Sequence, residues 1–278
     1  AYPEWHSELE KGFLGTTIPA GTGPEESIDI ALDTLVDHPN TPPFVARQII
    51  QRFVTSHPEP DYIERVSTAF ADGQYTLPSG SSVGDGRRGD LAATIAAGLF
   101  DEDARNATSR DEDAFGKVRE PVVRFVQWAR AFDAGTVTPE LTFPLYNTTF
   151  GGGLAQAPYK SPSVFNFYRP GYVAPGTETG AAGLTMPELQ LVNANSIANF
   201  ANFMTYFVFA FAANDPDAPE ATSFIPNYAD ELDLAEDPTA LIEHLDLLLN
   251  FGTTTDETKA TIVTFLQDIP LEDASDPN

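Results

Sequence analysis

The chain has 278 residues, of which 42% are hydrophobic, so it is long and apolar enough to bury a core. Its 41 acidic residues against 15 basic ones give a formal net charge of -26, a field that repels nucleic-acid phosphates and anionic lipid surfaces. The absence of cysteine excludes disulfides, thiolate zinc sites and cysteine nucleophiles. The composition therefore predicts neutral molecules, cations or basic proteins as partners, and no nucleic acid.

Only four of the basic residues are lysines. Acidic surfaces poor in lysine are common in proteins that work in salty water, where screening reduces self-repulsion, so we expect a marine or halotolerant source. The sequence begins at Ala1 without a basic segment followed by an apolar one, so we expect any signal peptide to be removed or to lie outside it.

The first half of the chain is predicted to be a helical array. Residues 1–26 contain several Gly and Pro residues and predict an irregular lead-in. In 27–134, Asp90 and Glu120-Pro121 have the form of helix starts, because Asp is a good N-cap and Pro is favoured in the first turn. Apolar periodicity and these signals predict helices at 27–37, 43–56 and 61–72, and helices that follow Asp90 and Glu120.

Residues 135–185 predict a long irregular loop, rich in Gly, Pro and aromatic side chains. It contains "KSPSVFNFYRPGY" at 160–172, which has four aromatic rings at a spacing that fits neither a helix nor a strand. We expect core anchoring to explain the apolar members of this stretch, Val164, Phe165 and Phe167. The side chains expected to face outward and meet a ligand are Asn166, Tyr168, Arg169 and Tyr172.

Residues 186–278 predict one long helix from Met186 to about Ala212, with a stripe of Phe facing the core, and two short C-terminal helices. Asp237 and Pro238 have the form of one helix start, and Thr254 with Glu257 has the form of a capping box. The most apolar run, 197–213, is too short and too rich in Asn for a membrane span. We therefore expect a single domain over 1–278, mainly α, as a multi-helix bundle or orthogonal array with little or no β.

Two common catalytic signatures are missing: the sequence has no His-x-x-x-His and no P-loop. Glycoside hydrolysis by a pair of carboxylates stays an alternative, because 41 acids offer many pairs. Three acids that flank predicted helix ends near the central loop are candidates, namely Asp37, Glu120 and Glu188. Each of them is also explained as a helix cap.

Two acidic segments, 101–113 and 214–220, have clustered carboxylates that suit calcium, but neither has the EF-hand pattern and both fit solvated loops. We therefore predict no metal site and no cofactor, with calcium as the alternative.

Several long segments combine Pro, Arg and aromatic residues at fixed spacing. They are "FLGTTIPAGTG" (13–23), "ALDTLVDHPNTPPFVARQIIQRFVTSHPEPDYIERVSTAFAD" (31–72), "RGDLAATIAAGLFDEDAR" (88–105), "GKVREPVVRFVQWARAF" (116–132), "SPSVFNFYRPGY" (161–172) and "YADELDLAEDPTALIEHLDLLL" (228–249). In this order they resemble the bacterial family catalogued as domain of unknown function 1800.

The resemblance implies an exported, mainly helical bacterial protein, in the periplasm, on the cell surface or outside the cell. It also implies an N-terminal helical half, with a Trp-His-x-His-Phe-like stretch, ahead of the point where this sequence begins. We therefore expect the chain to correspond to the C-terminal portion of the family, with that half as one potential partner. The leading hypothesis is a binding or accessory module for a glycan or a partner protein. The alternative is a secreted polysaccharide hydrolase with two carboxylates beside the 146–172 loop.

Overall fold

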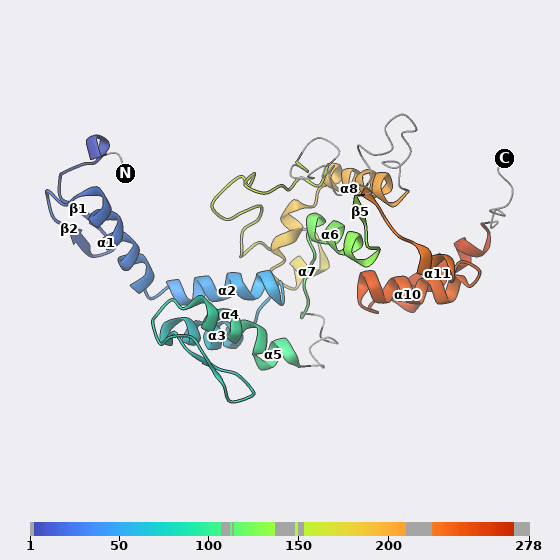
Figure 1. Cartoon of the computed structure of the whole chain (residues 1–278), viewed down its shortest axis with the longest axis horizontal. Coiled ribbons are helices and arrows are strands. Elements are labelled where there is room, and N and C mark those ends of the chain that lie inside the picture. The colour runs from blue at the N-terminus through green and yellow to red at the C-terminus, as the bar shows by residue number, and fades with distance from the viewer. Residues whose placement is uncertain are drawn as a thin grey trace. The chain divides into compact units, whose positions relative to one another are not determined.

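The computed structural model describes residues 3–106, 112, 114–136, 148–149, 153–209 and 224–269 (Figure 1). Helices predominate in this part of the chain, and its strands form only short two-stranded pairs, which confirms a mainly α fold with little β. The chain forms two compact units: unit 1 comprises Ala1–Val118 with Tyr168–Gln190, and unit 2 comprises Arg119–Phe167 with Leu191–Asn278. The assignment of one domain to the whole chain stays a prediction.

Unit 1 begins with a short 3-10 helix, a hairpin and a helix. These elements are η1 (Pro3–Trp5), β1 (Lys11–Phe13), β2 (Thr16–Ile18) and α1 (Pro24–Asp37). The hairpin is antiparallel, with Lys11 opposite Ile18. Helix α1 starts at a proline, whose missing N–H costs nothing in the first turn of a helix. Its apolar residues Ile28 and Leu32 are each 54% exposed, so this helix keeps an uncovered apolar stripe.

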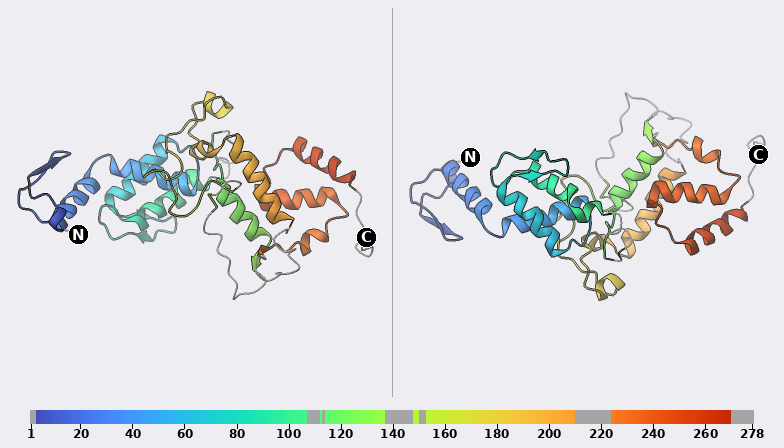
Figure 2. Two further views of the ribbon diagram at one scale, coloured as in Figure 1. Left: turned by 90° about the horizontal axis from the view of Figure 1, so that it is seen from above. Right: turned by 90° about the horizontal axis from the view of Figure 1, so that it is seen from below.

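Three helices form the core of unit 1, namely α2 (Thr41–Phe53), α3 (Pro60–Asp72) and α4 (Leu91–Phe100). They pack against one another, as Figure 2 shows in blue and teal. Ala46 and Ile50 of α2 are fully buried against Tyr62 of α3, whose hydroxyl donates to the carbonyl of Gly98. Phe53, the last residue of α2, lies outside this core and is 56% exposed.

Glycine fixes the turn between α3 and the small hairpin formed by β3 (Tyr75–Thr76) and β4 (Ser82–Val83). Gly73 ends α3 with a φ of 65°, a left-handed conformation that glycine adopts without a steric penalty. A Cβ atom at this position would lie 2.0 Å from the carbonyl oxygen of Arg87. Only glycine therefore lets the 84–89 segment pass this close to the end of α3.

The expected cap of α4 is confirmed, because the Asp90 side chain accepts a hydrogen bond from the N–H of Ala93 at 2.9 Å. Helix α4 ends at Phe100, and Asp101 caps a separate short helix, α5 (Glu102–Arg105). The later part of unit 1 is irregular apart from α7 (Glu178–Ala181) and the 3-10 helix η3 (Pro187–Leu191), whose last residue lies in unit 2.

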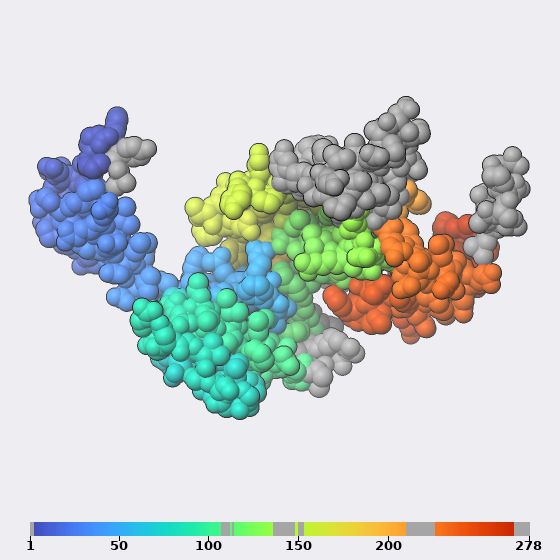
Figure 3. Space-filling view, viewed as in Figure 1, coloured from blue at the N-terminus to red at the C-terminus, as the bar shows by residue number. Residues whose placement is uncertain are grey.

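Unit 2 has its own aromatic core, built mainly from α6 (Pro121–Ala131) and α8 (Ala194–Val208). Phe125 and Trp128 of α6 pack against Phe203 and Phe207 of α8, and the rings of Phe203 and Phe207 have centroids 4.8 Å apart. The other elements of this unit are β5 (Gly135–Thr136), β6 (Phe224–Ile225), α9 (Ala229–Leu232), α10 (Pro238–Asn250) and α11 (Asp256–Gln267). Strands β5 and β6 pair antiparallel, and α10 packs against α11, orange to red in Figure 3.

The prediction of one long helix from Met186 is wrong. Residues Pro187–Leu191 form a 3-10 helix, and α8 begins only after Asn193, whose side chain accepts from the N–H groups of Asn195 and Ser196. This capping box stops the helix from extending toward Met186. Residues 210–212 lie outside the described residues.

Of the two C-terminal helix starts, Asp237 with Pro238 is confirmed, because Asp237 accepts from the N–H groups of Thr239 and Ala240. The second was placed one residue early. Thr255, not Thr254, caps α11 by accepting from the N–H of Thr258, and the Thr254 hydroxyl donates to Asp246 instead.

Candidate functional site

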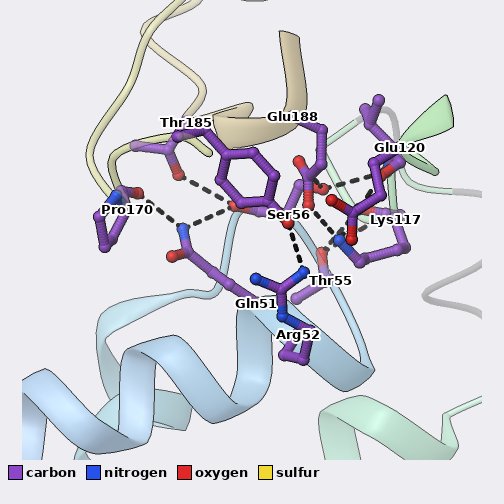
Figure 4. A network of polar contacts seen from close by, with 12 residues as sticks. Gln51, Arg52, Thr55, Ser56, Lys117, Glu120, Pro170, Thr185 and Glu188 are labelled. Atoms are coloured by element: carbon purple, nitrogen blue, oxygen red, sulfur yellow. Dashed lines mark hydrogen bonds and ion pairs between the residues drawn. The ribbon is translucent and has the colours of Figure 1, made fainter. Parts of the chain in front are cut away.

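A network of buried polar groups surrounds the C-terminal end of α2 in unit 1 (Figure 4). Its centre is Ser56, which is fully buried; its hydroxyl donates to Oε2 of Glu188 at 2.9 Å and accepts from the N–H of Val118 at 3.0 Å. The other carboxylate oxygen of Glu188 pairs with the ammonium of Lys117. Three segments that lie far apart in the sequence therefore meet at Ser56.

Backbone groups complete this Ser56 network. Thr55 exchanges hydrogen bonds with both the N–H and the carbonyl of Gly116. The amide of Gln51 donates to the carbonyls of Ser56 and Pro170, at 3.0 and 2.9 Å. These bonds attach the 114–118 and 168–172 segments to α2, because buried polar groups of this kind need partners.

A histidine belongs to the same region. The Nδ1 atom of His57 lies 3.0 Å from the N–H of Thr185, which donates to it. The hydroxyl of Thr185 donates to the carbonyl of Ser56 at 3.2 Å. His57 and Thr185 therefore hold the backbone ahead of η3 against the end of α2.

The chemistry of the Ser56 network is that of a structural contact. Ser56 has no exposed surface, and the Glu188 side chain is 1% exposed. A nucleophile or general acid has to reach its substrate within hydrogen-bond distance, and these groups are instead occupied by Lys117 and by backbone groups. The network therefore stabilises the fold of unit 1 around Glu188.

The structure places the other two candidate acids in different surroundings. Asp37 ends α1 with its side chain 77% exposed, 3.9 Å from Nε of Arg88. Glu120 is buried in unit 2 and accepts a hydrogen bond from the amide of Gln156 at 2.5 Å. Glu120 is the N-cap residue of α6 by position, but its side chain makes no capping bond, so the capping explanation is wrong for it.

The stretch 160–172 crosses from unit 2 into unit 1, and its side chains do not face as expected. Tyr168 is only 8% exposed, and its hydroxyl accepts from the guanidinium of Arg52 at 2.5 Å, so the prediction that it faces outward is wrong. Val164 is 95% exposed and Phe165 is 41% exposed, so core anchoring is wrong for both. Asn166 and Arg169 are exposed as expected, and Tyr172 and Phe167 are half-buried.

Two tight turns explain this exposure. The N–H of Lys160 donates to the carbonyl of Ala157 at 3.2 Å, and the N–H of Asn166 donates to the carbonyl of Ser163 at 3.1 Å. Side chains at the middle of such turns point away from the body. Tyr159 and Val164 therefore stand in solvent.

Unit 1 contains a groove of about 1240 Å³ beside the β3–β4 hairpin. Aromatic side chains on its walls are Tyr75 and Phe100, with Leu77 and Pro78 from the hairpin turn. Hydroxyl groups come from Thr68, Thr76 and Ser79, and charged groups come from Arg65, Asp101, Glu102 and Arg105.

One wall of the groove contains a cluster of ion pairs around Arg65. The guanidinium of Arg65 makes two bonds of 2.7 Å to the buried carboxylate of Asp101 and one of 2.8 Å to Asp103. The hydrogen bond to Asp101 raises the pKa of Arg65 above its usual value. Burial, followed by the nearby charge of Asp101, raises the pKa of Tyr75.

Arg105 lies at the end of the same wall, with its guanidinium 5.5 Å from the centre of the Phe100 ring. This is a cation–π contact, and it leaves the donors of Arg105 without an ion pair among the described residues. The groove therefore combines two aromatic rings, several hydroxyls and one basic group that is open to a ligand.

Sequence reasoning did not predict the groove, although segment 101–113, considered for calcium, contains Asp101, Glu102 and Arg105 of its lining. Of the Ser56 network it named only Glu188 as a candidate. The signal for the groove was present in part, because "DEDAR" (101–105) was read only as an acidic cluster, although it ends in Arg105 and directly follows Phe100. Nothing local pointed to Ser56, which meets Glu188 across 132 positions.

The calcium alternative has no geometry to support it in the part of the chain that the structure describes, which holds no cluster of three or more potential metal ligands. Asp101 and Asp103 are occupied by Arg65. Residues 107–111, 113 and 214–220 of the two acidic segments lie outside the described residues, so the expectation of no metal stays a prediction. Within the described residues, no helix has both the length and the apolarity to cross a membrane.

A comparison with known protein families gives a match over nearly the full length of the chain. The family described as "Protein of unknown function (DUF1800)" matches residues 1–277, almost the entire sequence. The searches of curated proteins and of solved structures gave no match.

Proposed function

The chain belongs to the DUF1800 family of proteins of unknown function, and from this premise we propose that its activity is binding: the groove of unit 1 holds a neutral polysaccharide. Export to the envelope or the medium is part of the proposal, because the family resemblance implies it. The observation that carries the proposal is the open groove that borders Tyr75, Phe100 and Arg105.

The lining suits sugar rings. A pyranose has an apolar face and a rim of hydroxyl groups, so it pairs with an aromatic ring on one side and with hydrogen-bonding groups at its edge. Phe100 and Tyr75 supply the rings, and Thr68, Thr76 and Arg105 supply hydrogen-bonding groups. A volume of about 1240 Å³ exceeds the usual range of about 300–1,000 Å³ for single small molecules, so it accommodates a short run of sugars.

Charge selects among glycans. The net charge of -26 repels sulfated and uronate-rich chains, so the favoured ligand is neutral. A partner protein is the other candidate ligand, and Asn166, Arg169 and Tyr172 remain the residues that the sequence assigns to it or to a glycan.

The buried state of Glu188 and Glu120 supports binding over catalysis, because neither carboxylate is open to a substrate. Polysaccharide hydrolysis remains the alternative function. It requires a different pair of acids, about 5 to 10 Å apart, in an accessible cleft.

The test is affinity electrophoresis of the purified chain in gels that contain a neutral β-glucan, a mannan or a sulfated galactan. We expect retardation by a neutral polymer and none by the sulfated one. Phe100→Ala should abolish most of the retardation, whereas Phe53→Ala, which removes an exposed ring of the same unit, should leave it unchanged.

Three results would point to a different site, ligand or activity. Retardation that survives Phe100→Ala but is lost in Tyr172→Ala would move the site to the 160–172 stretch. No retardation in any gel would count against a glycan ligand and favour a protein partner. New reducing ends after incubation with the polymer would establish the hydrolase alternative.

A further inference from the structure

Unit 2 contains a second hollow, separate from the groove in unit 1. It is a pocket of about 360 Å³ between α6, α9 and α10, closed at one side by Val208 at the end of α8. Its walls include Trp128, Phe132, Tyr228, Leu241, Leu245 and Leu249. The volume falls in the lower part of the range seen for small-molecule sites.

The surface of this pocket consists of apolar atoms only. The polar atoms of its lining residues are used elsewhere: the hydroxyl of Tyr228 donates to the carbonyl of Val208 at 3.1 Å, and Glu231 pairs with Nε2 of His244 at 2.9 Å. A polar ligand would lose its water and gain no hydrogen bond in exchange. The pocket therefore selects against polar groups.

Acidic residues beside the pocket disfavour a negatively charged ligand. The segment 228–237 contributes α9 and one side of the pocket, and it contains five acids and no basic residue, namely Asp230, Glu231, Asp233, Glu236 and Asp237. An anionic head group next to this segment is repelled, because its neighbours carry the same sign. Fatty acids and other anionic amphiphiles are thus disfavoured.

We propose that this pocket is a binding site for an uncharged apolar small molecule, such as a single alkyl chain with a neutral head or a compound with two aromatic rings. The ligand enters beside Leu232, which lines the pocket and is 71% exposed, and it contacts the ring of Trp128. The site is independent of the proposed glycan groove, because every residue that lines it belongs to unit 2.

Trp128 makes the test direct. The sequence has two tryptophans, and the other one, Trp5, is 85% exposed in unit 1. The variant Trp5→Phe leaves Trp128 as the sole tryptophan, and the neutral probe N-phenyl-1-naphthylamine accepts energy from a nearby indole. We expect saturable energy transfer from Trp128 to the probe, and displacement of the probe by 1-octanol.

Chain length and charge give two further readouts. Each added CH₂ in a series of primary alcohols should tighten binding about four-fold until the pocket is full, after which the affinity stops rising. Octanoate should displace the probe at least ten-fold less well than 1-octanol, because of the acids at the entrance.

Two variants separate this pocket from general hydrophobic binding. Ala235→Phe places a ring in the pocket and should remove saturable binding, whereas Leu247→Phe, on an exposed position of α10 outside the pocket, should not. If Ala235→Phe fails to fold by circular dichroism, Leu232→Asp at the entrance serves instead and should weaken binding at least ten-fold.

The proposal is overturned by any of three results in folded protein. These are probe binding that is unsaturable, an alcohol series whose affinity rises without a limit, or binding that persists unchanged in the pocket variants.

Discussion

The carboxylate of Glu188 is buried. Lys117, which is 22% exposed, balances its charge, and the hydroxyl of Ser56 donates a hydrogen bond to it. Removing one partner of a buried pair leaves the other charge uncompensated, which typically costs about 3–5 kcal/mol. We therefore expect Glu188→Ala to lower the free energy of unfolding by about 3 kcal/mol in urea titrations followed by circular dichroism.

Asp37→Ala is the matched control. Asp37 is exposed, and this substitution removes only a 3.9 Å contact with Arg88. Its effect should stay within about 0.5 kcal/mol. Equal effects of the two substitutions would contradict the structural role assigned to Glu188.

Asp246 gives a prediction that depends on pH. It accepts bonds from the N–H and the hydroxyl of Thr254, and its other oxygen lies 3.4 Å from the ammonium of Lys259. The hydrogen bond from the Thr254 side chain is the main reason that the pKa of Asp246 lies below its ordinary value of 3.8. A lowered carboxyl pKa stabilises the fold above that ordinary value, and this stability is lost as pH falls through the lowered pKa.

Asp246→Asn should therefore unfold at lower urea concentration than the parent at neutral pH, and the difference should shrink once pH falls below 3.8. Asp256→Asn is a suitable control, because Asp256 lies 3.8 Å from the same lysine but is fully exposed. A difference between parent and Asp246→Asn that grows toward acid pH would contradict the assignment.

At the scale of elements, the start of α4 depends on one side chain. Asp90 accepts from the N–H of Ala93, and its second oxygen accepts from the N–H of Asp85. Loss of such a cap typically costs about 1 kcal/mol. We expect Asp90→Ala to lower the free energy of unfolding by about this amount, or somewhat more because two bonds are lost.

Glu59 occupies the equivalent position before α3 but makes no capping bond with its side chain. Glu59→Ala should thus change the free energy of unfolding by less than about 0.5 kcal/mol in the same urea titrations. A loss at Glu59 as large as that at Asp90 would show that position, not the hydrogen bond, determines stability.

Local signals account for what the sequence predicted well. Pro at helix starts and the side chains of Asp90 and Asp237 act within three residues, so the starts of α4, α6 and α10 could be read directly. The prediction of one long helix from Met186 was wrong because it followed apolar periodicity alone. The local capping signal of Asn193 places the start of α8. A cap inside a periodic run is the stronger indication of a boundary.

The candidate sites depended on contacts between distant residues, and these left no mark on the local pattern. Ser56 and Glu188 meet across 132 positions, and Arg52 and Tyr168 across 116. Tyr168 was predicted to face outward for this reason, since its partner Arg52 on α2 could not be inferred from the residues near Tyr168. Val164 was predicted to lie in the core because it is hydrophobic. Its position in a tight turn exposes it instead.

At the scale of the whole molecule, the net charge of -26 is distributed so that like charges lie close together. Helix α1 shows this most clearly: Glu25, Asp29, Asp33 and Asp37 recur every four residues on one exposed side, and the helix has no basic residue. Like charges at this spacing repel and destabilise a helix. Repulsion of this kind acts across the surface of both units, and dissolved salt weakens it.

Added salt should therefore raise the thermal unfolding midpoint. Between about 0.01 M and 0.15 M NaCl the screening length falls from about 30 Å to about 8 Å, so most of the rise should occur in this range and amount to a few degrees. Asp33→Lys replaces two repulsive pairs on α1 with attractive ones and should raise the midpoint at low salt while reducing its salt dependence. Differential scanning calorimetry of both proteins over this range is the measurement. A midpoint that is flat or falls with NaCl would mean that surface repulsion does not limit the stability of this chain.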